Sequence, residues 1–293
     1  MLSNNITVCI FAWNEEKRIL RCIDNFKGLF PILVVDNCST DQTVKTVTDA
    51  GYKAVTVKNP GFIETTEVMD PVMAACDTDY ILVSSVSEFI PLALLLKYAE
   101  AANTGSHDIV RAFRESITAG QPIPISGRPR AGFPGELRFF RKGSVDFSGN
   151  KVHDRGTIVV APDRVLSLVT NPDFHFFQFR DYDCSHTELK HRTYNDVLAK
   201  QRYDAGARFS WTRLILHSSK QFLDAYVRFG SWRFGMLGFV HSFYRWHMEV
   251  GIWLRIWEWQ HGLSRAGVID ANNAVRVRLE KQITEFMNAR AKA

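Results

Sequence analysis

The stretch "ITVCIFAWNEEKRILRCIDNF" (6–26), followed by "ILVVDNCSTDQTV" (32–44), decides the fold. Each begins with a short run of Ile, Val and Leu, which is typical of a buried strand. The first continues into a segment with apolar residues at helical spacing (15–26), and the second into "STDQTVKTVTDAG" (39–51), a helix that ends at glycine. Two strand–helix units in succession predict a parallel sheet with right-handed crossovers.

The same alternation continues to about residue 106. We predict further strands at 53–59 and 80–86, and helices at 64–77 and from Pro91 onward. The later pattern is different: strand-like runs at 107–117, 135–147, 156–169 and 173–179 are followed by helical segments from 186. The sequence therefore predicts an α/β domain over 1–185 with a helical C-terminal extension over 186–293.

Composition places the chain among ordinary globular proteins. Of its 293 residues, 46% are hydrophobic and 23% charged, which excludes disordered and collagen-like chains. The net charge of +5 is compatible with anionic ligands or an acidic membrane surface. It is too small to indicate a nucleic-acid partner.

Cysteine usage and the N-terminus bear on location. The cysteines are scattered and form no C-x-x-C pair, so we expect a reducing compartment without disulfides or a zinc site. The first residues lack the basic start of a signal peptide. No apolar run reaches the roughly 18 residues of a membrane span. We therefore predict a cytoplasmic protein.

Polar side chains follow three of the predicted strands. The first strand runs into Asn14 and Glu15, the second into Asp36, and the fourth into "SVSE" (85–88). The carboxyl ends of parallel strands meet at one edge of a sheet, where ligands bind. These groups suit a ribose, a base edge or a metal-bound diphosphate. The local alternative is that Asn14 and Glu15 begin a helix and that residues after Asp36 cap the next one.

The first two motifs in tandem resemble the N-terminal signature of the family 2 inverting glycosyltransferases. The resemblance is strongest to the bacterial branch that builds lipopolysaccharide core, capsule or related surface glycans. It continues through "NPGF" (59–62), "YILVSSVSEFIP" (80–91), "LRFFRKG" (137–143), "VHDR" (152–155) and "NPDFHFFQFRD" (171–181).

The resemblance implies a fold and an activity. The fold is the A-type nucleotide-diphosphosugar transferase fold, which is Rossmann-like with a mostly parallel sheet. The activity is that of a hexosyltransferase, which moves a sugar with inversion and base assistance. The donor is a nucleotide-diphosphate sugar, and the acceptor is a glycan or a lipid-linked glycan.

The resemblance also implies the donor-site residues. Asn14, Glu15 and Asp36 would line the nucleoside pocket, and His175 would close the donor site near the metal and diphosphate. The acidic metal motif of the family, Asp-any-Asp followed by Glu, falls on Ser85, Ser87 and Glu88. Both aspartates of that motif are therefore serine in this chain.

This departure affects the expected cofactor. Divalent cations such as Mg²⁺ prefer several carboxylate ligands, and two hydroxyls with one carboxylate are a poor set. We expect Mg²⁺ or Mn²⁺ to be weakly bound or dispensable, with Glu88 and His175 as its remaining ligands. Arg138 is a candidate for binding the diphosphate, because the planar guanidinium can bind two phosphate oxygens.

The predicted catalytic base is Asp154 in "KVHDRG" (151–156), which matches an acidic residue in the corresponding family motif. Beside Arg155 this carboxylate should stay ionised, as a proton acceptor requires. His153 is the second choice, because an imidazole can take the same proton. The structural alternative is a salt bridge between Asp154 and Arg155.

The aromatic stretch 229–262 alternates tryptophans with arginines and histidines. Such a helix suits a peripheral contact with the inner face of the cell membrane. The alternative is packing on the core or on an identical partner in an oligomer.

A second function from another class stays open. The Ser85/Ser87 pair favours a catalytically silent glycosyltransferase-like protein that binds a nucleotide, a glycan or a partner enzyme. Nucleotidyl transfer is disfavoured, because "FAWNEEKR" (11–18) is no Gly-rich phosphate loop.

Overall fold

The computed structural model describes residues 1–293 apart from 61, 125–128, 130–131, 151–155, 181–183 and 292–293, and apart from the side chains of 184, 186, 190, 193 and 289–291. The chain divides into two compact units. The first unit comprises residues 1–183 and 225–238, and the second comprises 184–224 and 239–293. The return of 225–238 to the first unit is a feature that the sequence did not predict.

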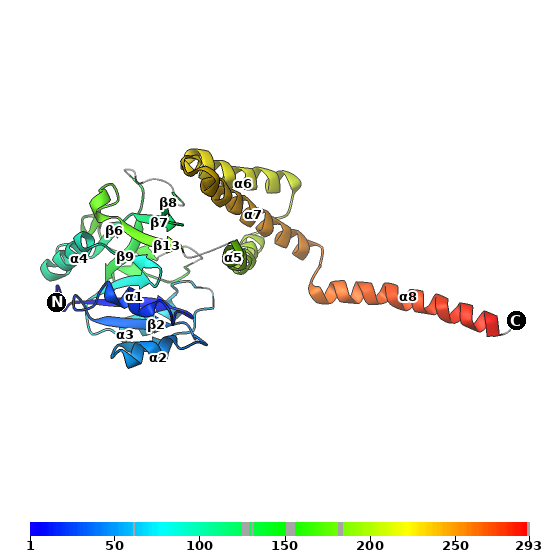
Figure 1. Cartoon of the computed structure of the whole chain (residues 1–293), viewed down its shortest axis with the longest axis horizontal. Helices are drawn as coiled ribbons and strands as arrows, with labels where there is room; N and C mark the ends of the chain where they lie inside the picture. Colours follow the sequence, from blue (N-terminus) through cyan, green and yellow to red (C-terminus); the bar gives the residue numbers. More distant parts are fainter. Residues whose placement is uncertain (61, 125–128, 130–131, 151–155, 181–183, 292–293) are drawn as a thin grey trace. The chain divides into compact units, whose positions relative to one another are not determined.

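The first unit is built on a seven-stranded sheet in the order β12-β6-β9-β4-β1-β2-β3. Figure 1 labels β2, β6 and β9 of this sheet. Its strands are β1 (Ile6–Ala12), β2 (Ile32–Asp36), β3 (Lys53–Thr56), β4 (Tyr80–Ser85), β6 (Ile109–Ala112), β9 (Glu136–Arg141) and β12 (Val165–Ser167). Only β9 is antiparallel to its neighbours, β4 and β6. The predicted parallel α/β architecture is therefore confirmed.

Helices cover both faces of this sheet. They are α1 (Ile19–Asp24), α2 (Thr43–Asp49), α3 (Thr66–Ala74) and α4 (Leu92–Thr104). In β1, Ile6, Val8 and Ile10 pack in one core with residues of α1 and α4, while Cys9 packs in a second core with α3. The strand is buried on both faces, which is why its sequence is continuously apolar.

Two smaller sheets complete the first unit. One has the order β5-β13-β7-β8, and the other pairs β10 with β11. Their strands are β5 (Glu88–Phe89), β7 (Arg114–Thr118), β8 (Gln121–Pro122), β10 (Val145–Asp146), β11 (Thr157–Ile158) and β13 (Phe176–Arg180). Short helical turns η1 (Pro162–Arg164) and η2 (Pro172–Phe174) precede β12 and β13, and η3 (Asp224–Arg228) and η4 (Ser231–Phe234) precede α7.

The apolar pattern predicted a strand-like run over 156–169, but the structure does not form one continuous strand there. It holds β11, the turn η1 and β12, because Pro162 starts a 3-10 turn between the two strands. The helix predicted at 64–77 is shorter and spans Thr66–Ala74.

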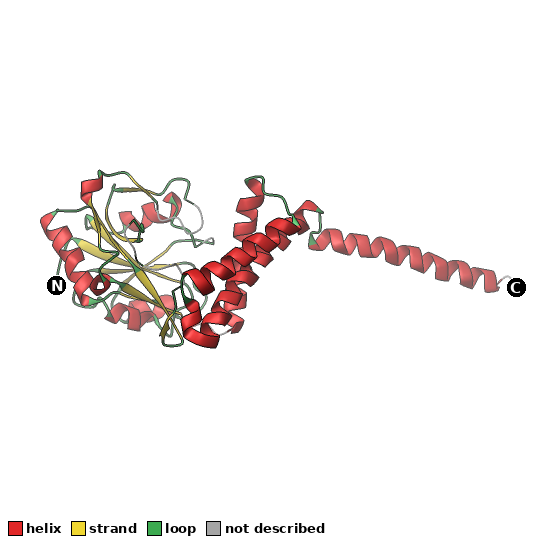
Figure 2. Cartoon of the chain, turned by 90° about the horizontal axis from the view of Figure 1, so that it is seen from above, coloured by secondary structure: helices red, strands yellow, loops and turns green. Residues whose placement is uncertain are grey.

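The described part of the second unit is helical, whereas the strands belong to the first unit (Figure 2). Its helices are α5 (Cys184–Asp204), α6 (Trp211–Leu223), α7 (Gly235–Gln260, of which 239–260 belong here) and α8 (Arg265–Ala291). The core of this unit contains Leu214, Ile252 and Ile256. Across the described residues, none of the helices is long and apolar enough to span a membrane.

Candidate functional site

The strand register brings three predicted site segments to one edge of the main sheet. Phe11 in β1 lies opposite Val35 of β2 on one side and Ser85 of β4 on the other. Asp36 lies opposite Ala12, and Ala12 comes two residues before Asn14 in the sequence. The carboxyl ends of these parallel strands therefore place Asn14, Asp36 and Ser85 at the same edge, as predicted.

Hydrogen bonds join the loop after β1 to the loop after β2. Asn14 has a positive φ of 55°, which an asparagine tolerates better than most residues. Its Oδ1 accepts a hydrogen bond from the Thr40 backbone N–H (2.8 Å), and its own N–H donates to Ser39 Oγ (2.8 Å). The Glu15 carboxylate binds the Arg18 guanidinium at 2.7 and 2.8 Å. In this arrangement Asn14 joins the two loops, whereas the Glu15 carboxylate is bound within its own segment.

Asp36 is different, because it keeps one unused acceptor. Its side chain is 1% exposed, and Oδ2 accepts from the Ser39 N–H at 3.0 Å. Oδ1 is buried and has no hydrogen-bond partner in the described part of the chain. A buried polar atom without a partner costs about 1–3 kcal/mol, which a ligand with an N–H or O–H donor would recover.

Sequence analysis did not identify two aromatic side chains at this edge, Trp13 and Phe62, as site residues. Trp13, directly after β1, is 50% exposed, and its ring packs edge-on against Phe62 with centroids 5.6 Å apart. A large exposed aromatic residue at a strand end beside Asn14 was the available signal. An exposed aromatic ring such as that of Trp13 offers an apolar face on which a nucleobase can stack.

The degenerate acidic motif forms a closed hydrogen-bonded group. The Ser85 and Ser87 hydroxyls lie 3.3 Å apart, and the Ser85 backbone N–H donates to Glu88 Oε2 at 3.1 Å. Glu88 Oε1 accepts from the Arg138 guanidinium, and both side chains are buried. Burial alone would lower the pKa of Arg138, but the carboxylates of Glu88, Glu136 and Glu64 together outweigh it and raise this pKa above its ordinary value.

Arg138 reaches Glu88 because of a β-bulge. On β9, Phe139 pairs with Val110 while Leu137 pairs with Arg111, so Arg138 is the extra residue. A bulge of this kind bends the strand and changes the direction in which a side chain points. Arg138 therefore binds a carboxylate of its own chain in this structure, rather than standing free for a diphosphate.

His175 is hydrogen-bonded to residues other than Ser85, Ser87, Glu88 and Arg138. Its Nδ1 is 2.8 Å from Glu115 Oε1, and its Nε2 is 3.0 Å from the Val169 carbonyl oxygen. The imidazole is buried and packs against Phe113, with ring centroids 5.0 Å apart. Both ring nitrogens face oxygen acceptors, so neither presents a free lone pair to a metal.

The residues present do not fit a divalent cation. One oxygen of Glu88 is used by a backbone N–H and the other by a guanidinium, whose positive charge would repel Mg²⁺ or Mn²⁺. Among the residues that the structure describes, no group of three or more His, Cys, Asp or Glu is placed to hold a metal. The predicted ligand pair Glu88 and His175 is at odds with this geometry, because each side chain is held by a different partner.

The predicted base falls on undescribed positions. Asp154 and the second choice, His153, lie outside the described residues.

Two basic residues that follow Arg138 in the sequence, Arg141 and Lys142, lie away from the candidate site. Arg141 is paired with Tyr80 at the start of β4, so Arg141 and Lys142 lie at the amino end of the parallel strands, opposite the candidate site.

Comparisons with known proteins agree with this architecture. The family model described as "Glycosyl transferase family 2" matches residues 7–121. The lipopolysaccharide core biosynthesis glycosyltransferase LpsC of Rhizobium meliloti (strain 1021) is 28% identical over 252 residues, which cover 81% of this chain and 86% of LpsC.

Two solved structures are similar at low identity. One is S. aureus TarS 1–349 in complex with UDP-GlcNAc, with a TM-score of 0.44, 13% identity, and coverage of 84% of this chain and 81% of that one. The other is Mycobacterium tuberculosis glucosyl-3-phosphoglycerate synthase with Mn²⁺ and UDP-glucose, with a TM-score of 0.42, 15% identity, and coverage of 71% and 81%.

The matched segment contains β1 to β4 and the edge at which Asn14, Asp36 and Ser85 meet. The sheet order and the helices on both faces form a mostly parallel α/β fold, followed by a helical C-terminal region. Residues 7–121 of this chain therefore match glycosyl transferase family 2, and the chain is similar to a lipopolysaccharide core glycosyltransferase over 81% of its length.

Proposed function

We propose that this glycosyltransferase binds a nucleotide-diphosphate sugar at the edge formed by β1, β2 and β4, and transfers the sugar with inversion. The observation that carries the proposal is the buried, unpartnered Oδ1 of Asp36. A base N–H or a ribose hydroxyl is the donor that this oxygen lacks. Trp13 and Phe62 supply an aromatic surface at the same edge.

The proposed acceptor is a glycan or lipid-linked glycan of the bacterial cell surface. The support is the likeness to LpsC, whose name states a role in lipopolysaccharide core biosynthesis. The acceptor hydroxyl oxygen attacks the anomeric carbon while its proton passes to Asp154. The bond from that carbon to the diphosphate breaks in line, and its electron pair leaves with the diphosphate. A single displacement of this kind inverts the anomeric centre.

We further propose that a divalent cation is dispensable for donor binding. The hydroxyls of Ser85 and Ser87 and the Arg138-bound carboxylate of Glu88 form a poor ligand set. The charge of the departing diphosphate must then be stabilised by N–H donors and cationic side chains of the protein. Donor binding and metal response can be measured in one experiment.

Calorimetric titration with UDP-, GDP- and dTDP-sugars, with and without Mn²⁺, tests both proposals. We expect one nucleotide class to bind, and Asp36→Asn to weaken its binding about 10- to 100-fold, the value of a hydrogen bond to a charged group. The matched control is Asp49→Asn, an exposed carboxylate on α2 paired with Lys45. Equal binding by both variants would remove Asp36 from the donor site.

The effect of Mn²⁺ on donor affinity is also measured in the double variant Ser85→Asp/Ser87→Asp. Mn²⁺ should change the affinity of the natural chain by less than about twofold and should increase that of the variant, because two carboxylates restore an oxygen-rich site. A requirement for Mn²⁺ in the natural chain would contradict the dispensable cation. Tight binding without donor hydrolysis or transfer, across a broad set of acceptors, would instead favour a catalytically silent binding protein.

A peripheral membrane contact fits a lipid-linked acceptor, and we propose α6 as its site. Trp211, Ile215 and Leu216 are exposed on this helix. The second unit has 15 Lys and Arg against nine Asp and Glu, a net charge of +6 in a chain whose total is +5. An exposed apolar face in a cationic unit suits an anionic bilayer.

Flotation with vesicles tests this contact. Trp211→Ser/Leu216→Ser should reduce binding to vesicles rich in phosphatidylglycerol by at least about tenfold, because each apolar side chain contributes about 1.5–3 kcal/mol when buried. Leu92→Ser, at an exposed position of the first unit, is the matched control. Equal flotation of both variants, or no flotation of the natural chain, would refute the contact.

A further inference from the structure

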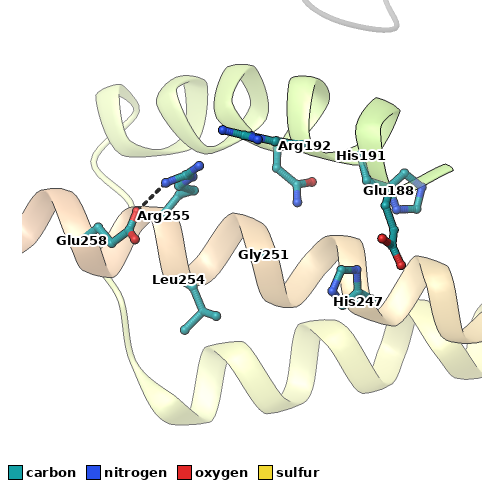
Figure 3. A pocket seen from close by; sticks show the side chains of 9 residues that line it. Glu188, His191, Arg192, His247, Gly251, Leu254, Arg255 and Glu258 are labelled. Carbon is teal, nitrogen blue, oxygen red and sulfur yellow. Dashed lines mark hydrogen bonds and ion pairs between the residues drawn. The ribbon is translucent and has the colours of Figure 1, made fainter. Parts of the chain in front are cut away.

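A pocket of about 250 Å³ lies between α5 and α7, entirely within the second unit (Figure 3). It is lined by Glu188, His191, Arg192, Asn195, His247, Gly251, Leu254, Arg255 and Glu258. Seven of these nine residues carry a polar or charged side chain, and the other two are Gly251 and Leu254. The lining is therefore suited to a small, hydrogen-bonding ligand.

Gly251 and Asn195 are an unusual combination in this wall. A glycine inside a helix costs about 0.5–1 kcal/mol relative to alanine. Here a Cβ at position 251 would lie 2.3 Å from Asn195 Nδ2, so the glycine makes room for the amide. Asn195 is only 8% exposed, and its Oδ1 has no hydrogen-bond partner in the described part of the chain.

These two features are both unfavourable for the protein alone. A buried carbonyl oxygen without a partner costs about 1–3 kcal/mol, in addition to the cost of the glycine. A ligand that donates an O–H or N–H to Asn195 would recover the larger of these costs. The amide therefore points to a ligand with hydroxyl or amine donors.

The two arginines of the pocket differ in their partners. Arg255 is balanced by Asp196 and Glu258, each 2.8 Å away. Arg192 is exposed and forms no ion pair or hydrogen bond with the residues that the structure describes. Its guanidinium is free to bind a carboxylate or phosphate with two parallel hydrogen bonds.

The other end of the pocket gathers Glu188, His191 and His247 (Figure 3). A carboxylate and imidazoles can accept and donate hydrogen bonds to neighbouring hydroxyls. Within the described residues no group of His, Cys, Asp or Glu, this one included, is placed to hold a metal ion. A ligand that fits this pocket would have hydroxyl groups at the Glu188 end and an anionic group at the Arg192 end. A sugar that carries a carboxylate or a phosphate has both.

We propose that the α5–α7 pocket binds one sugar residue of the acceptor, and that this residue carries a carboxylate or a phosphate. Asn195 and Glu188 hold its hydroxyls, and Arg192 holds its anionic group. The proposal rests on the proposed function, because it assumes a glycan acceptor. It adds an acceptor-recognition site in the helical unit, separate from the residues of the donor edge.

Binding of three matched probes to the full chain tests the proposal. Glucose, glucuronate and glucose 6-phosphate share their ring hydroxyls but differ in charge, and their binding can be followed by saturation-transfer NMR and calorimetry. We expect the anionic probes to bind at least about tenfold more tightly than glucose, the value of a hydrogen-bonded charge pair. The stronger of the two anionic probes identifies the carboxylate or the phosphate as the natural group.

Variants assign the binding to the pocket. Arg192→Gln should reduce the affinity for the anionic probes to that for glucose, while Arg213→Gln, an exposed arginine of α6 outside the pocket, should leave it unchanged. Asn195→Leu should weaken all three probes. Failure of every probe to bind, binding of both anionic probes no tighter than that of glucose, or insensitivity to Arg192→Gln would each overturn the proposal.

A parallel titration with the nucleotide sugar separates this proposal from the proposed function. Arg192→Gln should bind the nucleotide sugar as the natural chain does. A natural chain that binds glucuronate but no nucleotide sugar would refute the donor site alone. The reverse result would refute the α5–α7 site alone.

Discussion

Replacing Asp154 with asparagine is expected to lower turnover about 10²- to 10⁴-fold, the usual contribution of a general base. Asparagine has a similar shape but cannot take the proton of the acceptor hydroxyl. The affinity for the nucleotide sugar should stay unchanged, because the proposed role concerns the acceptor. Steady-state transfer rates and donor calorimetry on the same samples would separate the two quantities.

His153→Gln is the matched control for this experiment, because His153 is the neighbouring residue and the second candidate base. A full rate in Asp154→Asn combined with a large loss in His153→Gln would reassign the base to the imidazole. Full rates in both variants would exclude base assistance by this segment.

Glu88→Ala is expected to lower the free energy of unfolding by about 3–5 kcal/mol, because it leaves the buried Arg138 guanidinium without its partner. The cation–π contact of that guanidinium with the Phe176 ring, at 5.8 Å, and the nearby carboxylates of Glu136 and Glu64 replace only a part of the lost energy. Urea unfolding followed by circular dichroism measures the difference.

The control for Glu88 is Glu100→Ala, which breaks the exposed pair of Lys97 and Glu100 and should change stability by less than about 1 kcal/mol. The double variant Glu88→Leu/Arg138→Met should recover most of the loss, because two apolar side chains leave no buried charge. A loss below about 1 kcal/mol in Glu88→Ala would show that the pair is not held as described.

Arg138 illustrates why part of the site escaped prediction. The sequence made it a candidate phosphate ligand from its residue type, because a guanidinium can bind two phosphate oxygens. Its actual partner is Glu88, 50 residues earlier in the chain, reached through a bulge in β9. No local pattern encodes a bulge or the partner that it selects, because both depend on the pairing of β9 with β6.

His175 shows the same limit. The family resemblance implied that it closes the donor site near the metal and diphosphate, whereas in the structure it is a buried side chain. Its partners, Glu115 and the Val169 carbonyl, come from β7 and from the segment after β12. The parallel pairing of β13 with β7 sets these contacts, and that pairing is made over a long separation in the sequence.

The sequence by itself determined the alternation of strands and helices over the first hundred residues, and with it the edge at which Asn14, Asp36 and Ser85 meet. These features follow from local apolar periodicity and from the right-handed crossover, which requires no knowledge of distant residues. Only the tertiary structure decided which polar atoms remain unused. Asp36 Oδ1 and Asn195 Oδ1 are left without partners, whereas Glu88 and His175 are occupied. Hydrogen bonding is short-ranged and directional, so its outcome depends on side chains that folding brings together from distant parts of the chain.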